Sequence, residues 1–385
     1  MGRPKTDGGR IDWLDELRTF MIVLVVNMHA CVTYSHVGSW YVNEAPEPSL
    51  MTKLPFVFWQ AHLQSFFMGT LFLVSGYLAH GAIGRRGPAG FARERLFRLG
   101  LPTLLYMLVL HPLIVIAINP YGNDYGSKLR AYERFVLHGD FVGSSGPMWF
   151  AAALLVFCLV LAAVRRMRGA DAAPDGSEPA GPSPRAVLLW LAGLIGATFL
   201  TRTVQPLNTS VLNMQLCYFP QYVFAFVTGL AAARGRWLER LAGSPLARRS
   251  GWCALVLGTP LLAGVLVFGG VLKGKGLTLL GGGWHLAALA YAAWEQTVGT
   301  GLGLGCLALF STKLNRATPL SKWLSNRSFG VYLFHPVILI LVTLALRPLD
   351  TDPFFKVAIL TALGLAGSFL VADLARRVPG LRALV

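Results

Sequence analysis

Long apolar stretches separated by short polar segments dominate this sequence. Each of ten stretches is about 17 to 25 residues long, enough for a helix rising 1.5 Å per residue to cross a hydrocarbon core about 30 Å thick. The pattern predicts an all-α, polytopic integral membrane protein with about ten transmembrane helices. The predicted spans are 14–34, 56–80, 97–118, 147–164, 186–203, 216–233, 252–272, 285–310, 328–346 and 354–374.

Composition supports the membrane class. Of the 385 residues, 54% are hydrophobic and only 14% are charged, which argues against one or two soluble domains. The five cysteines show no spacing typical of a metal site or a disulfide framework, so no metal and no bound cofactor are predicted. Asp15, Glu16 and Arg18 interrupt the first apolar run, and no small-residue cleavage site follows it. This favours an uncleaved first span over a signal peptide.

The net charge of +16 is distributed as a membrane protein distributes it. Basic residues form short clusters between the apolar spans, so nucleic-acid binding is not expected. Most of them fall on the side of the N-terminus, which predicts a multi-pass protein of the plasma membrane with both termini in the cytoplasm. The basic loop residues of the other side are Lys53, Lys128, Arg130, Arg134, Arg202, Lys273, Lys275, Arg347 and Lys356.

The spans define one transmembrane domain. We expect cytoplasmic tails at 1–13 and 376–385 around a domain at 14–375. Within it, residues 169–184 lack large apolar side chains and are predicted to be a disordered cytoplasmic linker.

Arg18 and His29 stand out in the first span because intramembrane Arg and His are costly and often functional. Eleven residues at about 100° each place them on one helix face, about 16 Å apart. Two interpretations are open: Arg18 reaches the headgroups while His29 is a core histidine, or both face a cavity inside the bundle.

The string Leu14-Asp15-Glu16-Leu17-Arg18, followed by His29, resembles the start of the membrane acyltransferase-3 family. In that family acyl transfer depends on this Arg and His, so the resemblance implies catalytic roles for Arg18 and His29.

Four later stretches extend the resemblance in the family's order. The stretch Gly146-Pro147-Met148-Trp149-Phe150 is similar to a Gly-x-x-Trp-Phe variant rather than the Trp-Ser-Leu-x-x-Glu form of many sugar O-acetylating members, which leaves the acceptor open. The matching residues are Ser75 and Gly76 in the second span, Arg95 and Arg98 before Pro102, Trp149, and Tyr332 and His335 in the ninth span.

The resemblance implies an O-acyltransferase whose partners are the bilayer, an acyl-CoA donor and a sugar. The donor, expected to be acetyl-CoA, would place its phosphates on Arg93, Arg95 or Arg98, although ordinary topology-setting charge also explains these residues. The acceptor would be a hydroxyl of a carbohydrate or carbohydrate-containing molecule. Since the chain stops soon after the last span, the bundle is expected to transfer the group itself or to pass it to a separate partner.

Acyl transfer to an alcohol needs a base for the hydroxyl proton and a group that stabilises the developing oxyanion. A neutral imidazole suits the first task, so His29 is the predicted base. Arg18 stays protonated and would position the donor or stabilise charge. An acyl-imidazole intermediate on His29 is a second mechanism that the sequence leaves open.

Other polar residues have open interpretations. Glu295, in the eighth span, should be paired, protonated or facing a wet cavity, and Arg18 is a possible partner. Arg202 and Gln205, with the stretch Cys217–Tyr222 that opens the sixth span, are consistent either with an acceptor contact or with interfacial anchoring. The loop 35–55 is read as an aromatic belt, with an acceptor entrance as the alternative.

Two competing classes remain: a secondary transporter or exporter, and a non-catalytic scaffold. No repeat relates the first five spans to the last five, and ionisable residues within the spans are few, which disfavours transport. Consumption of acyl-CoA separates an enzyme from both.

Overall fold

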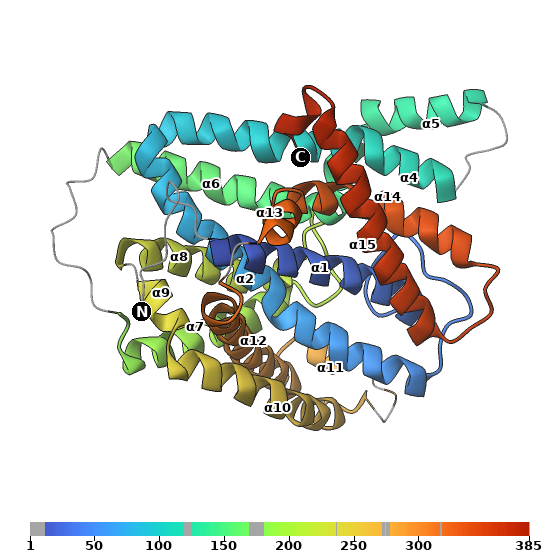
Figure 1. Ribbon diagram of the computed structural model, residues 1–385. Coiled ribbons are helices and arrows are strands. Elements are labelled where there is room, and N and C mark those ends of the chain that lie inside the picture. The colour runs from blue at the N-terminus through green and yellow to red at the C-terminus, as the bar shows by residue number, and fades with distance from the viewer. Residues whose placement is uncertain are drawn as a thin grey trace.

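The computed structural model describes residues 12–118, 125–168, 181–235, 237–271, 274, 278–315 and 318–384. Within these ranges the secondary structure is helical, apart from one isolated bridge between Val211 and Met214. The helices pack into one bundle (Figure 1). The predicted all-α class is confirmed.

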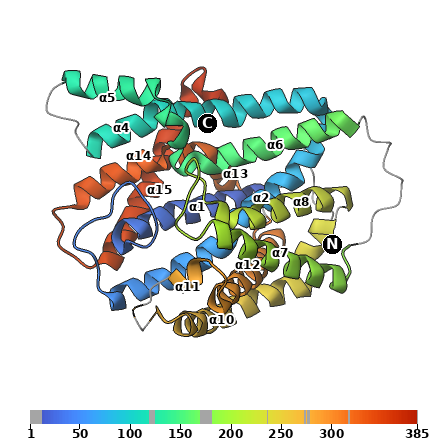
Figure 2. The same ribbon diagram turned by 180° about the vertical axis from the view of Figure 1, so that it is seen from behind.

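Helix α1 (Asp12–Ser35) is the central helix of the bundle. Of its apolar window, 67% is buried, a larger share than in any other candidate span of the described residues. It contacts α2, α12, α14 and α15, and both ribbon views show it between α2 and the α14–α15 pair (Figures 1 and 2). Most side chains in the middle of α1 therefore contact other helices.

The next two predicted spans form one long helical run with a break. At Gly87 the backbone has φ 67° and ψ 166°, outside the helical region, and Pro88 follows. Glycine accepts this positive φ without steric cost, so the run turns here. Its parts are α2 (Leu50–Arg95), η1 (Leu96–Gly100), α3 (Leu101–Leu105), η2 (Tyr106–Leu110) and α4 (His111–Ile118).

The remaining helices follow in chain order. They are α5 (Tyr125–Leu137), η3 (Asp140–Gly143), η4 (Gly146–Met148), α6 (Trp149–Arg168), α7 (Pro184–Val204), η5 (Leu216–Tyr218), α8 (Phe219–Gly235), α9 (Trp237–Ala242), α10 (Pro245–Phe268), α11 (Thr278–Gly281), α12 (Leu286–Thr312), α13 (Pro319–Ser325), α14 (Ser328–Leu346), α15 (Pro353–Arg377) and η7 (Leu381–Ala383).

A helix lies at every predicted span. Eight helical stretches of the described residues are long and apolar enough to cross a membrane, and one of them is the whole run Leu50–Ile118 that Gly87 interrupts. Helix α12, at the eighth predicted span, is 27 residues long but is not among the eight. The count of ten crossings and the cytoplasmic termini stay predictions.

The predicted tails and linker differ slightly from the structure. Helix α1 starts at Asp12, inside the predicted tail, because Trp13 and Leu14 are already buried. Residues 169–180 of the predicted linker lie outside the described residues. The linker's last residue, Pro184, begins α7, and the Ser183 side chain accepts a hydrogen bond from Ala186 N as its N-cap.

Small residues allow close crossing of α2 and α8. A Cβ built on Gly76 would lie 2.1 Å from the carbonyl oxygen of Phe226, and one on Gly229 would lie 2.1 Å from that of Leu73. Neither position has room for a methyl group without separating the helices. Gly76, predicted as a supporting site residue, therefore lies in a helix contact, next to Ser75.

Gly76→Ala should destabilise the protein by about 1–3 kcal/mol, the usual cost of overpacking. The matched control is Gly84→Ala, on the same helix, where a Cβ would meet no atom within 4 Å. Unfolding of both variants in detergent checks this, and equal stabilities would show that the α2–α8 crossing can relax.

Candidate active site

A cavity of about 680 Å³ opens at the end of the bundle where α1 ends. His29 contributes its side chain from α1, and Trp40 and Tyr41 contribute theirs from the loop that follows. One face of α2 forms a further wall, which includes Gln60 and Gln64. Residues of this loop therefore line a cavity, which an aromatic belt alone does not describe.

His29 is packed against two other rings, those of Trp40 and His335. Its imidazole is stacked on Trp40, with ring centroids 3.9 Å apart, and lies 5.4 Å from the ring of His335. The Nδ1 atom of His29 is buried and has no hydrogen-bond partner in the described residues. The imidazole is thus held in a fixed plane at the cavity wall with one nitrogen uncommitted.

His335 is fully buried beside His29 on α14. Its Nδ1 lies 2.8 Å from the carbonyl oxygen of Tyr332, and a carbonyl can only accept, so this nitrogen carries the proton. In the neutral ring Nε2 is then unprotonated, and it has no partner in the described residues. His335, predicted as a supporting site residue, therefore lies against the ring of His29.

Tyr332 and Trp149 complete this side of the cavity. Both line it, and the Tyr332 hydroxyl donates to the carbonyl oxygen of Pro147. This bond joins α14 to the turn that precedes α6. The structure therefore brings four predicted site residues, His29, Trp149, Tyr332 and His335, to one place.

Tyr41 anchors the loop that carries Trp40. Its hydroxyl lies 2.7 Å from Nδ1 of His111 and 2.8 Å from the hydroxyl of Tyr106. Burial raises the pKa of Tyr41 to about 12, so the hydroxyl keeps its proton at neutral pH. These contacts hold the neighbouring Trp40 ring against His29.

Arg18 lies at the other end of α1. Its side chain is 42% exposed and forms an ion pair with Asp15, 3.2 Å away. It does not line the cavity. Arg18 and His29 share a helix but not a pocket, as their spacing of about 16 Å requires.

The three predicted donor-binding arginines have different surroundings. Arg93 and Arg98 are exposed, and Arg98 is 3.4 Å from Glu94. Arg95 turns inward, with its guanidinium 5.0 Å from the ring of Phe91 and with Nε buried and without a hydrogen-bond partner. Arg95 thus lacks the carboxylate partner that Arg98 has, and it is the more buried of the two.

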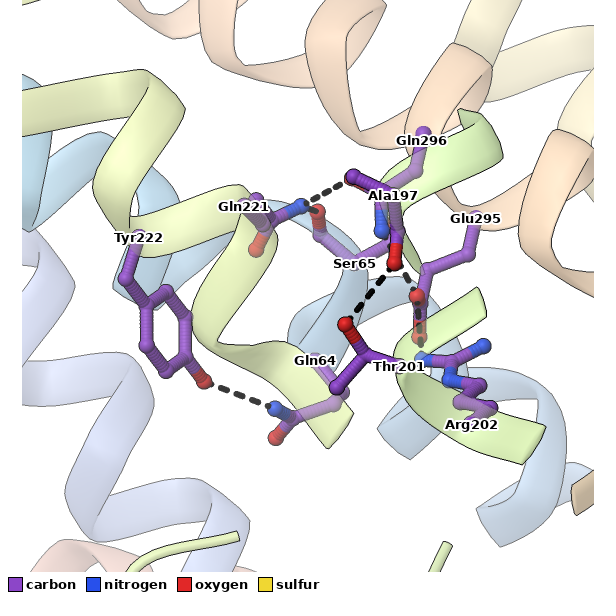
Figure 3. A network of polar contacts seen from close by, with 9 residues as sticks. All are labelled: Gln64, Ser65, Ala197, Thr201, Arg202, Gln221, Tyr222, Glu295 and Gln296. Atoms are coloured by element: carbon purple, nitrogen blue, oxygen red, sulfur yellow. Dashed lines mark hydrogen bonds and ion pairs between the residues drawn. The ribbon is translucent and has the colours of Figure 1, made fainter. Parts of the chain in front are cut away.

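Glu295 is paired, but its partner is Arg202 and not Arg18. Nη2 of Arg202 lies 2.6 Å from Oε2 of Glu295, and both side chains are buried, at 0% and 1% exposed (Figure 3). The pairing with Arg18 suggested by the sequence is wrong, because Glu295 lies on α12 beside the end of α7. Interfacial anchoring of Arg202 is wrong as well, since its guanidinium does not reach solvent.

A polar network continues from this pair across the bundle. Gln296 donates to Glu295 over 2.8 Å, and Gln221 donates to Gln296 and to the carbonyl oxygen of Ser65 (Figure 3). Beside it, Gln64 donates to the Tyr222 hydroxyl over 3.3 Å. The network joins α2, α7, α8 and α12 behind the cavity wall.

Sequence reasoning missed several cavity residues. Gln60 and Gln64 are four residues apart in an apolar span, a spacing that places two amides on one helix face and marks a polar surface. Asn208 and Asn213, in contrast, lie in a loop, and no spacing signal indicates them. No group of three His, Cys, Asp or Glu side chains in the described ranges could hold a metal ion.

Comparison with known proteins adds independent information. A family model described as an acyltransferase domain matches residues 11–373. The chain is 25% identical over 186 residues to a glucans biosynthesis protein C of Salmonella gallinarum, covering 48% of this chain and 45% of that protein. It is 24% identical over 196 residues to a protein of the same name from Escherichia coli O6:K15:H31, covering 50% and 49%. The chain thus matches about half the length of these curated relatives, and no solved structure matches it.

Proposed function

This chain belongs to the acyltransferase-3 family of membrane acyltransferases, and from that premise we propose that it is an O-acyltransferase. It would move an acyl group, most simply acetyl, from a cytoplasmic acyl-CoA to a hydroxyl of a carbohydrate or carbohydrate-containing acceptor. The observation that carries the proposal is the position of the His29 imidazole on the wall of a large cavity. Since its Nδ1 is buried, the nitrogen that acts as the base would be Nε2.

His29 acts as the general base in this mechanism. It takes the proton of the acceptor hydroxyl while the oxygen attacks the thioester carbonyl carbon, and the carbon–sulfur bond then breaks to release CoA, which takes up a proton. His335, stacked beside it, keeps the imidazole plane fixed. Arg18 is too far from His29 along α1 to touch the same atoms and would act on the donor.

The second mechanism, an acyl-imidazole on His29, has its own signature. Hydroxylamine-sensitive acyl label on the wild type, absent from His29→Ala, supports the covalent route. Label that survives the substitution excludes it, and direct transfer with His29 as base is then the mechanism.

The chemistry of the cavity wall fits a neutral, hydroxyl-rich acceptor. Among the described residues no carboxylate lines it, and the ammonium of Lys53 contacts Glu47. Amides of Gln60, Gln64, Asn208, Asn213 and Gln215 offer donors and acceptors, while Trp40 and Trp149 offer flat apolar faces. Because the relatives carry the name glucans biosynthesis protein, glucose oligomers are the first acceptors to test.

The test is direct. Purified protein in detergent receives radiolabelled acetyl-CoA and glucose oligomers, and label in the oligosaccharide fraction supports the proposal. Absence of both transfer and acyl-CoA consumption, with acetyl-CoA and with longer donors, overturns it and leaves transport as the leading hypothesis.

Donor binding should depend on Arg95 more than on Arg98. Charge-assisted hydrogen bonds are worth about 1.5–3 kcal/mol, so Arg95→Ala should weaken acetyl-CoA binding by about tenfold or more. Arg98→Ala is the matched control, because its side chain is 62% exposed and already pairs with Glu94. Isothermal titration calorimetry measures both. Equal losses, or none, would place the phosphates elsewhere.

A further inference from the structure

A further part of the cavity wall comes from η5 and α12. There Tyr218, at the end of η5, and Tyr291, on α12, face the same space that His29 borders. Leu262, Leu266 and Leu280 lie beside these rings in the lining. This region joins aromatic rings to an apolar floor, and of its residues the sequence singled out only Tyr218, as part of the stretch Cys217–Tyr222.

Arg202 lies directly behind the two tyrosines. Its guanidinium carbon is 5.3 Å from the ring centroid of Tyr218 and 5.5 Å from that of Tyr291, within the range of cation–π contact. The planar guanidinium thus fixes both rings from the rear while it pairs with Glu295. The Tyr291 ring also stacks on Trp294, with ring centroids 5.7 Å apart, and it is buried. The partly exposed Tyr218 therefore offers the more open ring to the cavity, and Tyr291 flanks it.

The absence of net charge on the Arg202–Glu295 pair limits which ligands this part of the wall can bind. Arg202 and Glu295 are fully buried and neutralise each other, so neither presents net charge to the cavity. An anionic group would gain little here and would lose its hydration. The faces of the rings, with the amides of Asn208 and Gln215 also in the lining, suit a neutral ring with apolar C–H faces and peripheral hydroxyls.

We propose that Tyr218 and Tyr291, held by Arg202, form a distal subsite for a second sugar unit of an oligomeric, uncharged acceptor. The first unit presents its hydroxyl to His29, and the second packs on the tyrosine rings. This inference rests on the proposed function, because only a sugar acceptor gives the subsite its role. Sugar binding at the subsite can nevertheless be measured without acyl transfer. Arg202 is a positioning residue, since it acts through the two rings.

Binding is measured on the His29→Ala variant, which cannot use His29 as a base. Fluorotyrosine placed at position 291 is followed by fluorine NMR while glucose or a glucose hexamer is added. The hexamer is expected to shift the Tyr291 signal at lower concentration than glucose does. A second label at Tyr77, which bonds to Glu239 and does not line the cavity, should not move.

Two substitutions test the separate roles of the Tyr291 ring and the Arg202 guanidinium. Tyr291→Phe keeps the ring and should keep the hexamer shift of a label at Tyr218. Arg202→Lys keeps the charge but loses the planar group that stacks on the rings, so the hexamer should bind about tenfold more weakly. The matched control is Arg347→Lys, in an exposed pair with Glu44. No shift at Tyr291 with any oligomer in a folded protein overturns the proposal.

Transfer provides an independent readout. In Tyr291→Ala, the ratio of transfer to the hexamer over transfer to glucose should fall about tenfold, the size of one aromatic contact. An unchanged ratio contradicts the subsite, whatever the total activity. If the wild type consumes no acyl-CoA, the proposed function fails, while the NMR shift still decides whether the subsite exists.

Discussion

Replacing His29 with alanine is expected to lower acyl transfer by about 10²–10⁴-fold, the contribution of a positioned general base. The imidazole lies on the cavity wall, stacked on Trp40 and beside His335, with Nδ1 buried and without a hydrogen-bond partner. Donor binding should persist because the arginines at the other end of the bundle are untouched. Transfer of label from acetyl-CoA to glucose oligomers, measured beside donor affinity, checks both halves of this result.

His62→Ala is the matched control for His29. His62 is a partly buried histidine on α2 whose ring contacts Trp294 and which does not line the cavity. Its removal should leave the transfer rate within a few-fold of the wild type. If the two variants lose activity equally, the loss reports general damage to the bundle and His29 has no special role.

Breaking the Arg202–Glu295 pair should cause the largest loss of stability. Either Arg202→Ala or Glu295→Ala leaves an uncompensated charge in the interior, which costs about 3–5 kcal/mol in comparable buried pairs. Replacing both with methionine should cost much less, because no charge is then stranded. Denaturant unfolding of the three variants in detergent measures the difference.

The exposed pair of Arg347 and Glu44 is the control for that cycle. Arg347 is 53% exposed, and its Nη2 lies 2.9 Å from Glu44. Exposed pairs contribute about 0–1 kcal/mol, so Arg347→Ala should change stability little. Single variants of Arg202 and Glu295 that are as stable as Arg347→Ala would mean that water or another partner compensates the buried charges.

The helices could be predicted from the sequence because the length of an apolar run alone indicates a helix that crosses the hydrocarbon core. Helix α14 begins and ends where the ninth predicted span does. A break in the helix between the second and third predicted spans could also be expected, because Gly87-Pro88 lies between them. The agreement concerns the helices, and the number of membrane crossings is a separate question.

Lateral neighbours were harder to predict. Periodicity gives the face of a residue on its own helix, so Arg18 and His29 could be placed on one face of α1. It does not give the helix that packs against that face. Glu295 therefore received the wrong partner: Arg202 is 93 positions away in the sequence, and only the packing of α7 against α12 brings them together.

In the candidate site, too, some residues could be predicted from sequence motifs, whereas others depend on how separate segments pack. Family motifs pointed to His29, Trp149, Tyr332 and His335, which the structure brings together. Trp40 and Tyr41 lie in a loop, where no periodic pattern marks the residue that folds back over a helix end. For Tyr218 the sequence left an acceptor contact and interfacial anchoring equally open, and it did not indicate Tyr291. The contact of both rings with Arg202 depends on three separate segments, which no local pattern brings together.

In the proposed reaction, an acyl group supplied at the Arg95 end of the bundle reaches an acceptor in the cavity at the His29 end. The most direct measurement uses oriented vesicles, with radiolabelled acetyl-CoA only on the side of Arg95 and glucose hexamer only on the side of the cavity. The account predicts labelled hexamer with the wild type and none with His29→Ala. Label that appears only when donor and acceptor share one side, or that appears equally with His29→Ala, would contradict it.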